Sequence, residues 1–176
     1  MNNKIFFEWS NEMIISNLIL GIIFLVVLVI CFRTISFQDP FSLWGGKLIA
    51  IIIIFGVTIT SLFITPRYVS YNEEGVKIKK IIGSKKIPQS EICNLVGIDT
   101  RTIANSKRKF GSGGVGGYIG LFYNKQLGDY HLYLTMRKNL VLLETTNQKK
   151  YVFNCSKRDE LINFAEMNYK RNEKEH

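Results

Sequence analysis

The chain has 176 residues and carries 23 Lys and Arg against 14 Asp and Glu, which gives a formal net charge of +9. Residues 67–176 hold the whole of this excess, with 20 Lys and Arg against 11 Asp and Glu. Because that part of the chain numbers only 110 residues, it has room for one small domain, which excludes a second one.

The chain opens on a short segment, residues 1–12, that we expect to be a cytosolic arm. Phe6, Phe7 and Trp9 follow one another closely in this segment. Because aromatic rings favour the boundary between lipid and water, we expect these three side chains to anchor the arm at the membrane interface.

Residues 13–66 contain two stretches without a charged residue, 13–32 with 20 residues and 48–66 with 19. Each is close to the roughly 20 residues that a helix needs to cross a hydrocarbon core of about 30 Å. Within the second stretch, residues 48–55 are apolar on every side of a helix and leave no face for water. We therefore predict a transmembrane hairpin of two helices over residues 13–66.

Two alternative interpretations of these stretches are weaker. A pair of buried helices in a soluble fold would need more apolar surface around them than a chain of this size has left. A cleaved signal sequence would need a positively charged start, whereas Lys4 is offset by Glu8 and Glu12. A lipoprotein cleavage before Cys31 would need a small residue where the chain has Ile30.

The distribution of positive charge predicts the orientation of this hairpin. The loop between the two stretches holds only Arg33 and Lys47 together with Asp39. The chain just after the second stretch is richer in cations: Arg67, Lys77, Lys79, Lys80, Lys85 and Lys86. Since positive charge stays on the cytoplasmic side, we expect a multi-pass protein of the cytoplasmic (inner) membrane with both termini in the cytosol.

After residue 66 the pattern changes to short alternating segments, which are typical of half-buried strands. The turn at residues 72–75 joins the first two strands, because Gly75 can adopt a positive φ. We predict roughly seven short strands in all, with residues 101–124 as the least regular part. A helix from Ser156 to about Arg171 follows, and residues 172–176 should fray. Residues 67–171 are therefore expected to form one α+β domain.

Five segments of this domain carry a family resemblance. They are Tyr71-Asn-Glu-Glu-Gly75, Ile82-Gly-Ser-Lys-Lys-Ile-Pro88, Phe110-Gly-Ser-Gly-Gly-Val-Gly-Gly-Tyr118, Leu121-Phe-Tyr-Asn124 and Arg137-Lys-Asn-Leu-Val-Leu-Leu-Glu-Thr145. Together they resemble the bacterial pleckstrin-homology-like (bPH) domain family, in particular members with two N-terminal transmembrane helices. The resemblance implies a PH-like domain, a seven-stranded antiparallel barrel or curved sheet capped by the C-terminal helix. It also implies a binding or scaffolding role without catalysis.

The glycine-rich segment is the most distinctive of the five. Gly111, Gly113 and Gly116 have the spacing of a dinucleotide-binding fingerprint, but no helical pattern follows them to meet a pyrophosphate. We expect either a tightly bent loop or a functional loop that packs on the membrane or receives a partner. The residues of this glycine loop are Phe110, Gly111, Gly113, Gly114, Gly116, Gly117 and Tyr118.

Basic residues flank this loop and recur in the first hairpin of the domain. The candidates for binding an anionic surface are Lys107, Arg108, Lys109, Lys79, Lys80, Lys85 and Lys86. They could lie on anionic lipid headgroups, or they could serve only to set the topology of the hairpin. Nucleic acid is not expected as a partner, because stacking aromatic residues at regular spacing are missing.

The sequence offers little for catalysis. His131 lies in an alternating strand, and no carboxylate pair, nucleophile motif, metal-ligand cluster or cofactor motif accompanies it. Cys31, Cys93 and Cys155 are expected to be small buried hydrophobic residues. We therefore expect a protein that is not an enzyme and needs no cofactor or metal.

These observations favour a non-catalytic integral membrane protein whose cytosolic domain binds the membrane surface or a protein partner. The alternative is an assembly module for homo- or hetero-oligomers of membrane proteins. A small regulator that acts on transport through the spans is a third possibility. Neither span carries the ionisable residue expected along an ion path, which argues against a channel or transporter.

Overall fold

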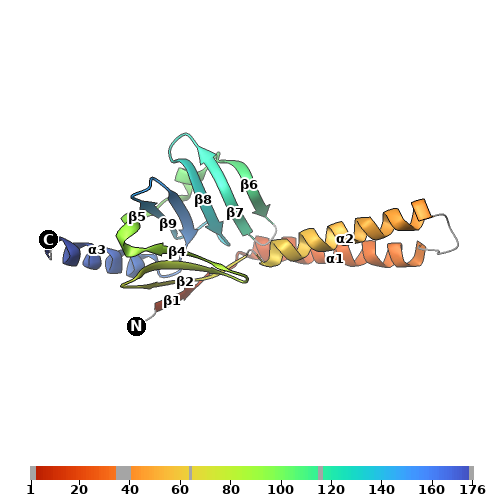
Figure 1. The fold of residues 1–176 in the computed structure, drawn as a ribbon, viewed down its shortest axis with the longest axis horizontal. Helices are drawn as coiled ribbons and strands as arrows, with labels where there is room; N and C mark the ends of the chain where they lie inside the picture. The colour runs from red at the N-terminus through yellow and green to blue at the C-terminus, as the bar shows by residue number, and fades with distance from the viewer. Residues whose placement is uncertain (1–2, 35–40, 64, 115–116, 175–176) are drawn as a thin grey trace.

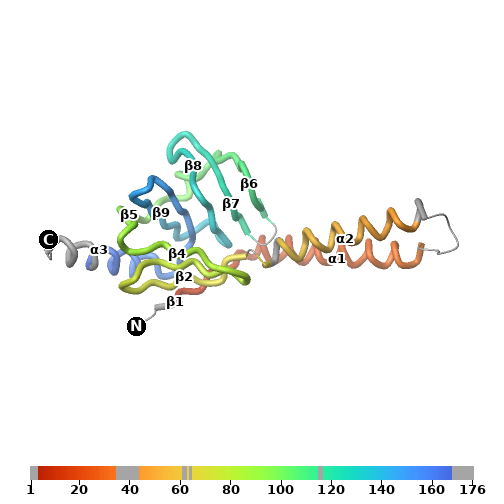
Figure 2. Tube along the Cα trace, viewed as in Figure 1, coloured from red at the N-terminus to blue at the C-terminus, as the bar shows by residue number. Residues whose placement is uncertain are grey.

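The structure, a computed structural model, describes residues 3–34, 41–63, 65–114 and 117–174. Two long helices lie side by side and project from one end of a domain built from two sheets (Figure 1). The C-terminal helix lies at the end of the domain away from them, and the described N-terminal segment lies along the domain itself (Figure 2).

The two projecting helices are α1, Asn11–Thr34, and α2, Phe41–Phe63. They contact each other through the stacked rings of Phe24 and Phe55, whose centroids are 6.0 Å apart. Most of their apolar side chains are exposed. Among the described residues, α1 is long and apolar enough to cross a membrane by length and composition, while the apolar stretch of α2 is the shorter Trp44–Thr60. The first predicted span is thus matched by a helix, and the second stays a prediction.

Polar groups in these two helices bond within the helical pair. The hydroxyls of Thr58 and Thr60 donate to the carbonyls of Ile54 and Gly56 at 2.8 and 2.7 Å. Lys47 Nζ donates to the carbonyl of Thr34 at the end of α1, at 2.6 Å. This contact places a cation at a helix C-terminus, where unbonded carbonyls and the helix dipole favour it.

The first sheet has four antiparallel strands in the order β1-β2-β3-β4. Their bounds are β1 Asn3–Phe6, β2 Pro66–Asn72, β3 Gly75–Lys80 and β4 Ser84–Pro88. The expected arm is therefore wrong for residues 3–7, because β1 pairs with β2 and both Ile5 and Phe7 are buried in the core. Only Phe6 and Trp9 of the three aromatic residues are exposed. The domain thus includes a strand that lies before the helical pair in the sequence.

The second sheet has six strands in the order β5-β9-β10-β8-β7-β6. Their bounds are β5 Ile92–Ile98, β6 Lys107–Gly114, β7 Gly117–Asn124, β8 Gly128–Leu134, β9 Leu140–Thr145 and β10 Lys150–Asn154. Short 3₁₀ helices, η1 Gln89–Glu91 and η2 Thr100–Ile103, flank β5. The α+β character is confirmed, but the described part of the chain has ten strands rather than roughly seven. The arrangement is not wholly antiparallel either, because β10 runs parallel to β8.

The core joins the two sheets to the last helix, α3 Arg158–Lys174. Val69 and Ile78 from the first sheet, Leu143 and Phe153 from the second and Leu161 from α3 belong to one buried cluster. Each such side chain contributes roughly 1.5–3 kcal/mol through burial. The helix runs three residues beyond the predicted end, and residues 175–176 of the predicted frayed tail lie outside the described part.

Candidate functional site

The turn between β3 and β4 lies where α2 meets the domain. The amide of Ile81 donates to the carbonyl of Thr65 at 3.1 Å, and the amide of Ile82 donates to the carbonyl of Phe63 at 3.0 Å. These bonds tie the turn to the end of α2. Ile81 is nevertheless 43% exposed and Ile82 59% exposed. We call residues 81–83 the isoleucine tip.

Predicted cations surround the isoleucine tip on both strands. In the register of β3 and β4, Lys79 lies opposite Ser84 and Lys77 lies opposite Lys86 on the outer face of the sheet. Lys85 lies opposite the buried Ile78 and therefore faces the other way. Its Nζ is 5.4 Å from the ring centroid of Tyr151 in the second sheet.

The outer face of the first sheet carries a cation that the sequence analysis missed. The register aligns Lys4, Ser70, Lys77 and Lys86 across all four strands, and Lys4 Nζ lies 5.5 Å from the ring centroid of Tyr68. A groove of about 320 Å³ follows this row. Lys4 could not be assigned from the sequence, because its partner strand begins some 60 residues later, after both helices.

The glycine loop is a hairpin rather than an irregular loop. Gly111 and Gly120 face each other in β6 and β7 and have φ values of 113° and 142°. A Cβ on either would lie 2.1 or 2.0 Å from a carbonyl oxygen of the opposite strand. Both positions therefore require glycine. A strand and not a helix follows the turn, and Gly116 lies outside the described residues.

The cations of the basic cluster at residues 107–109 have different neighbours. Lys109 Nζ donates to Asp129 Oδ2 at 2.8 Å and lies 5.2 Å from the ring centroid of Tyr123. Arg108 instead lines a cleft between the glycine hairpin and α1. This cluster lies on the edge strand of the six-stranded sheet, whereas the lysines around the isoleucine tip belong to the four-stranded sheet. The predicted cations thus belong to two different sheets of the domain.

Phe110 and Tyr118 of the predicted loop have different settings. Phe110 is 79% exposed on β6. The ring of Tyr118 lies on β7, and the guanidinium carbon of Arg137 is 4.4 Å from its centroid. Tyr118, Arg137 and Gly114 also line a cleft beside the first turns of α1, together with Glu12 and Met13.

His131, the one histidine considered for chemistry, lies between the two sheets. Its ring stacks on Tyr151 with the centroids 5.3 Å apart. Burial lowers its pKa below the usual range, and the positive charges of Lys85 and Lys149 lower it further. The imidazole is accordingly neutral at pH 7.

The three cysteines differ from one another in burial. Cys155 is buried, and burial raises the pKa of its thiol to about 11. Cys31 is half-buried, and Cys93 is exposed on β5, so the prediction of a buried side chain is wrong for Cys93. Among the described residues, no group of three or more His, Cys, Asp or Glu could hold a metal ion.

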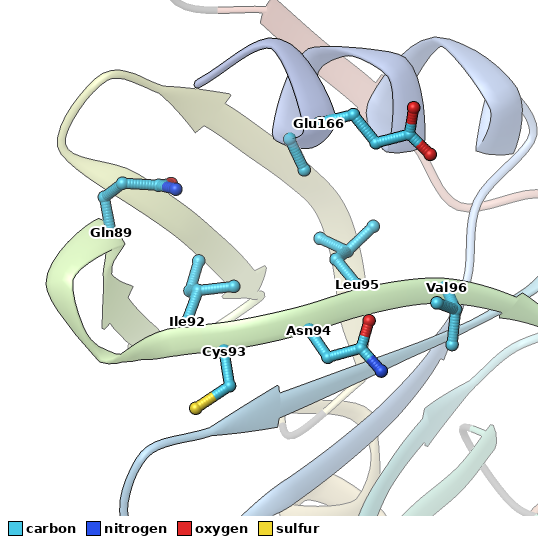
Figure 3. Close-up of a pocket in the computed structure, with 8 residues that line it drawn as sticks. Gln89, Ile92, Cys93, Asn94, Leu95, Val96 and Glu166 are labelled. Carbon is cyan, nitrogen blue, oxygen red and sulfur yellow. The ribbon is translucent and has the colours of Figure 1, made fainter. Parts of the chain in front are cut away.

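A groove of about 250 Å³ lies between β5 and α3. Ile92 and Leu95 point from β5 towards α3, Cys93 points away, and Glu166 lies on the helix above them (Figure 3). Since β5 ends the sheet order, its outer edge has no neighbouring strand among the described residues. Such an edge can pair with a strand from another chain.

Comparison with known proteins gave one match. A family model described as "Bacterial PH domain" matches residues 67–168, which covers the strands from β2 onward and most of α3. Searches of curated proteins and of solved structures found no match.

Proposed function

Because the chain belongs to the bacterial PH domain family over residues 67–168, we propose that it is a non-catalytic membrane protein whose PH-like domain binds the anionic surface of the cytoplasmic membrane. In this proposal α1 and α2 both cross the bilayer, and the domain lies against the cytosolic leaflet. The isoleucine tip and its lysines make the contact.

The pairing of β1 with β2 supports the two-pass arrangement. These strands lie directly before α1 and directly after α2. Two strands of one sheet have to be on the same side of a membrane, so the chain between them has to cross it an even number of times. The side-by-side arrangement of α1 and α2 fits two crossings (Figure 1).

The isoleucine tip carries the proposal for the surface. One hydrogen bond ties it to Phe63 at the end of α2 and a second ties it to Thr65 just after the helix, so in this proposal it lies where α2 leaves the bilayer. Two exposed isoleucines can enter the interface there, while Lys79, Lys80 and Lys86 reach the headgroups beside them. Each lysine near an anionic leaflet contributes about 1 kcal/mol.

The test measures how close the tip comes to lipid in the full-length protein in nanodiscs. An NBD fluorophore is placed on an I82C variant in a C31S/C93S background, and its quenching by spin-labelled lipid is recorded. The control is the same label at K125C, in the turn after β7, roughly 20 Å along that strand from the glycine turn.

We expect strong quenching at position 82 and little at position 125. Adding phosphatidylglycerol to phosphatidylcholine should increase the quenching at position 82, and replacing Lys79, Lys80 and Lys86 by Gln should remove that increase. Equal quenching at both positions, or no effect of the anionic lipid, would contradict the proposal.

A second candidate function, an assembly module, is favoured by the free edge of β5. Val96 is exposed on this edge, and the groove against α3 lies beside it. If the edge joins copies of the chain, the full-length protein in detergent should have a concentration-dependent mass, and V96K should shift it to the monomer. A mass that stays monomeric at every concentration would exclude homo-oligomers formed through this edge.

A further inference from the structure

We propose that the cleft between α1 and the glycine hairpin binds the phosphate of a membrane phospholipid, with Arg108 as the phosphate ligand. This inference rests on the proposed function, because it requires α1 to lie in a bilayer. It adds a site for one lipid molecule, formed by the helix and the domain together.

The cleft has a volume of about 330 Å³ and two unlike walls. One wall is α1, where Ile19 and Ile23 are exposed as they would be towards acyl chains. The other wall is the end of the glycine hairpin, with Ser112, Gly113 and Gly114. An apolar wall next to a polar one matches a lipid at the level where its headgroup meets its chains.

The position of the cleft along α1 agrees with the level at which a lipid headgroup meets its acyl chains. Asn11, Glu12, Ser16 and Asn17 give the first two turns of α1 a polar character, and the helix is apolar from Leu18 to Phe32. The cleft spans this change from polar to apolar residues, because it is lined by Ser16 as well as by Ile19, Leu20 and Ile23. The boundary between headgroups and hydrocarbon therefore falls within it.

Arg108 supplies the charge that such a lipid would meet. Its Nη1 lies 3.0 Å from the place that a Cβ of Gly113 would occupy, so the guanidinium extends along the hairpin and over this glycine. Among the described residues no ion pair involves Arg108, whereas its neighbour Lys109 is paired with Asp129. A guanidinium without a carboxylate can bind a phosphate through two parallel hydrogen bonds.

The adjoining cleft does not cancel this charge. Glu12 lines that second cleft together with Arg137, whose guanidinium stacks on Tyr118. The two arginines and the one glutamate leave the region beside α1 positive. Gly113 leaves room for this charge, because a side chain there would fill the space that the Arg108 guanidinium occupies.

Native mass spectrometry of the full-length protein tests this site. The protein in detergent is titrated with phosphatidylglycerol and then released from the micelle in the spectrometer, and the fraction that carries a lipid is recorded for the wild type, R108Q, G113V and the charge-matched control K125Q. Glycerol phosphate, which has the headgroup chemistry without acyl chains, is titrated in parallel. The NBD label at position 82 is measured in the same variants.

We expect R108Q to weaken lipid binding about tenfold, because it removes a hydrogen-bonded charge. G113V should weaken it as well by displacing Arg108 with its charge intact, and K125Q, in the turn after β7, should leave it unchanged. Glycerol phosphate should bind far more weakly than the lipid, since it lacks chains for the apolar wall. Lipid binding in R108Q equal to that of the wild type would overturn the site, as would an equal loss in K125Q.

The label at position 82 separates this inference from the proposed function. Normal quenching at the isoleucine tip together with unchanged lipid binding in R108Q would refute the cleft alone. Loss of the quenching contrast between positions 82 and 125 in the wild type would refute the proposed function, whatever the lipid titration gives.

Discussion

At the scale of single residues, the protonation of His131 affects the stability of the domain. The neutral imidazole stacks on Tyr151, and Lys85 and Lys149 oppose its protonation. In the unfolded chain the same histidine protonates near pH 6.5. The unfolded state therefore binds more protons once the pH falls below that value, and this favours unfolding.

We predict that the free energy of unfolding decreases as the pH falls through about 6.5, and that H131F reduces this dependence. Urea unfolding of the full-length protein in micelles, followed at several pH values, measures it. The difference between the wild type and H131F isolates the histidine from the carboxylates that titrate at lower pH. Parallel curves for the two proteins would show that His131 is not the group responsible.

Glycines differ from one another according to what surrounds them. Gly120 combines a positive φ with a carbonyl 2.0 Å from the place of a Cβ, while Gly83 has a positive φ of 79° and open space around it. We predict that G120A destabilises the domain by about 3 kcal/mol or more. G83A, which has only the strained φ, should cost about 1–2 kcal/mol. Urea unfolding of both variants measures the difference, and equal losses would contradict the clash at Gly120.

At the scale of elements, the sequence was most informative where strands pair with their neighbours in the chain. The β2–β3 hairpin with its turn at Gly75 and the helix α3 were both predicted from local patterns. The hairpin of β6 and β7 was not predicted, because glycines such as Gly111 and Gly120 are poor strand formers and hide the alternation. The parallel pairing of β10 with β8 arises because β10 inserts between β8 and β9, an order that alternation does not encode.

The candidate site, like the fold, could be predicted from the sequence only in part. The sequence identified the cations at residues 79–86 and 107–109, but not that they belong to two different sheets. It also missed the exposure of Ile81 and Ile82, although two consecutive isoleucines before Gly83-Ser84 break the alternation and are a usable signal for an exposed apolar turn. The cleft at Arg108 could not be found in this way, because its walls are distant in the sequence.

The contribution of β1 to the domain gives a prediction at this scale. Phe7 is buried in the core, while its neighbour Phe6 is 62% exposed and makes a T-shaped contact with the Tyr68 ring. We predict that F7A destabilises the domain by about 3–5 kcal/mol, and that the matched control F6A costs less than about 1 kcal/mol. Chemical unfolding of the two variants measures this, and a small loss in F7A would mean that β1 detaches readily.

At the scale of the whole molecule, hydrogen bonds attach the domain to both projecting helices. The amide of Ser10 donates to the carbonyl of Thr135, and the Thr135 hydroxyl donates to the carbonyl of Glu8 at 2.7 Å. These bonds hold the segment between β1 and α1 against the end of β8. The domain is therefore fixed to the first helix at Thr135 and to the second at the isoleucine tip, and a change in the tilt of the helices would move it.

The proposed two-pass topology predicts that both termini face the same side of the membrane. Epitope tags at the two ends should both be cleaved by protease in inverted membrane vesicles and both be protected in right-side-out spheroplasts. The lysines after α2 predict which side this is. Cleavage of one tag from each side would contradict the pairing of β1 with β2 in the inserted protein.

The place of β1 in the chain also sets the order of events during synthesis. β1 leaves the ribosome before α1, but its partner β2 follows only after α2. If both helices cross the membrane as proposed, β1 can dock only after both have been inserted, and a chain with a wrongly inserted hairpin would leave the edge of β2 unpaired and the site of Phe7 empty. Domain folding would then depend on correct insertion, and charges added to the loop between the helices to invert the hairpin should shorten the lifetime of the protein in a pulse-chase experiment.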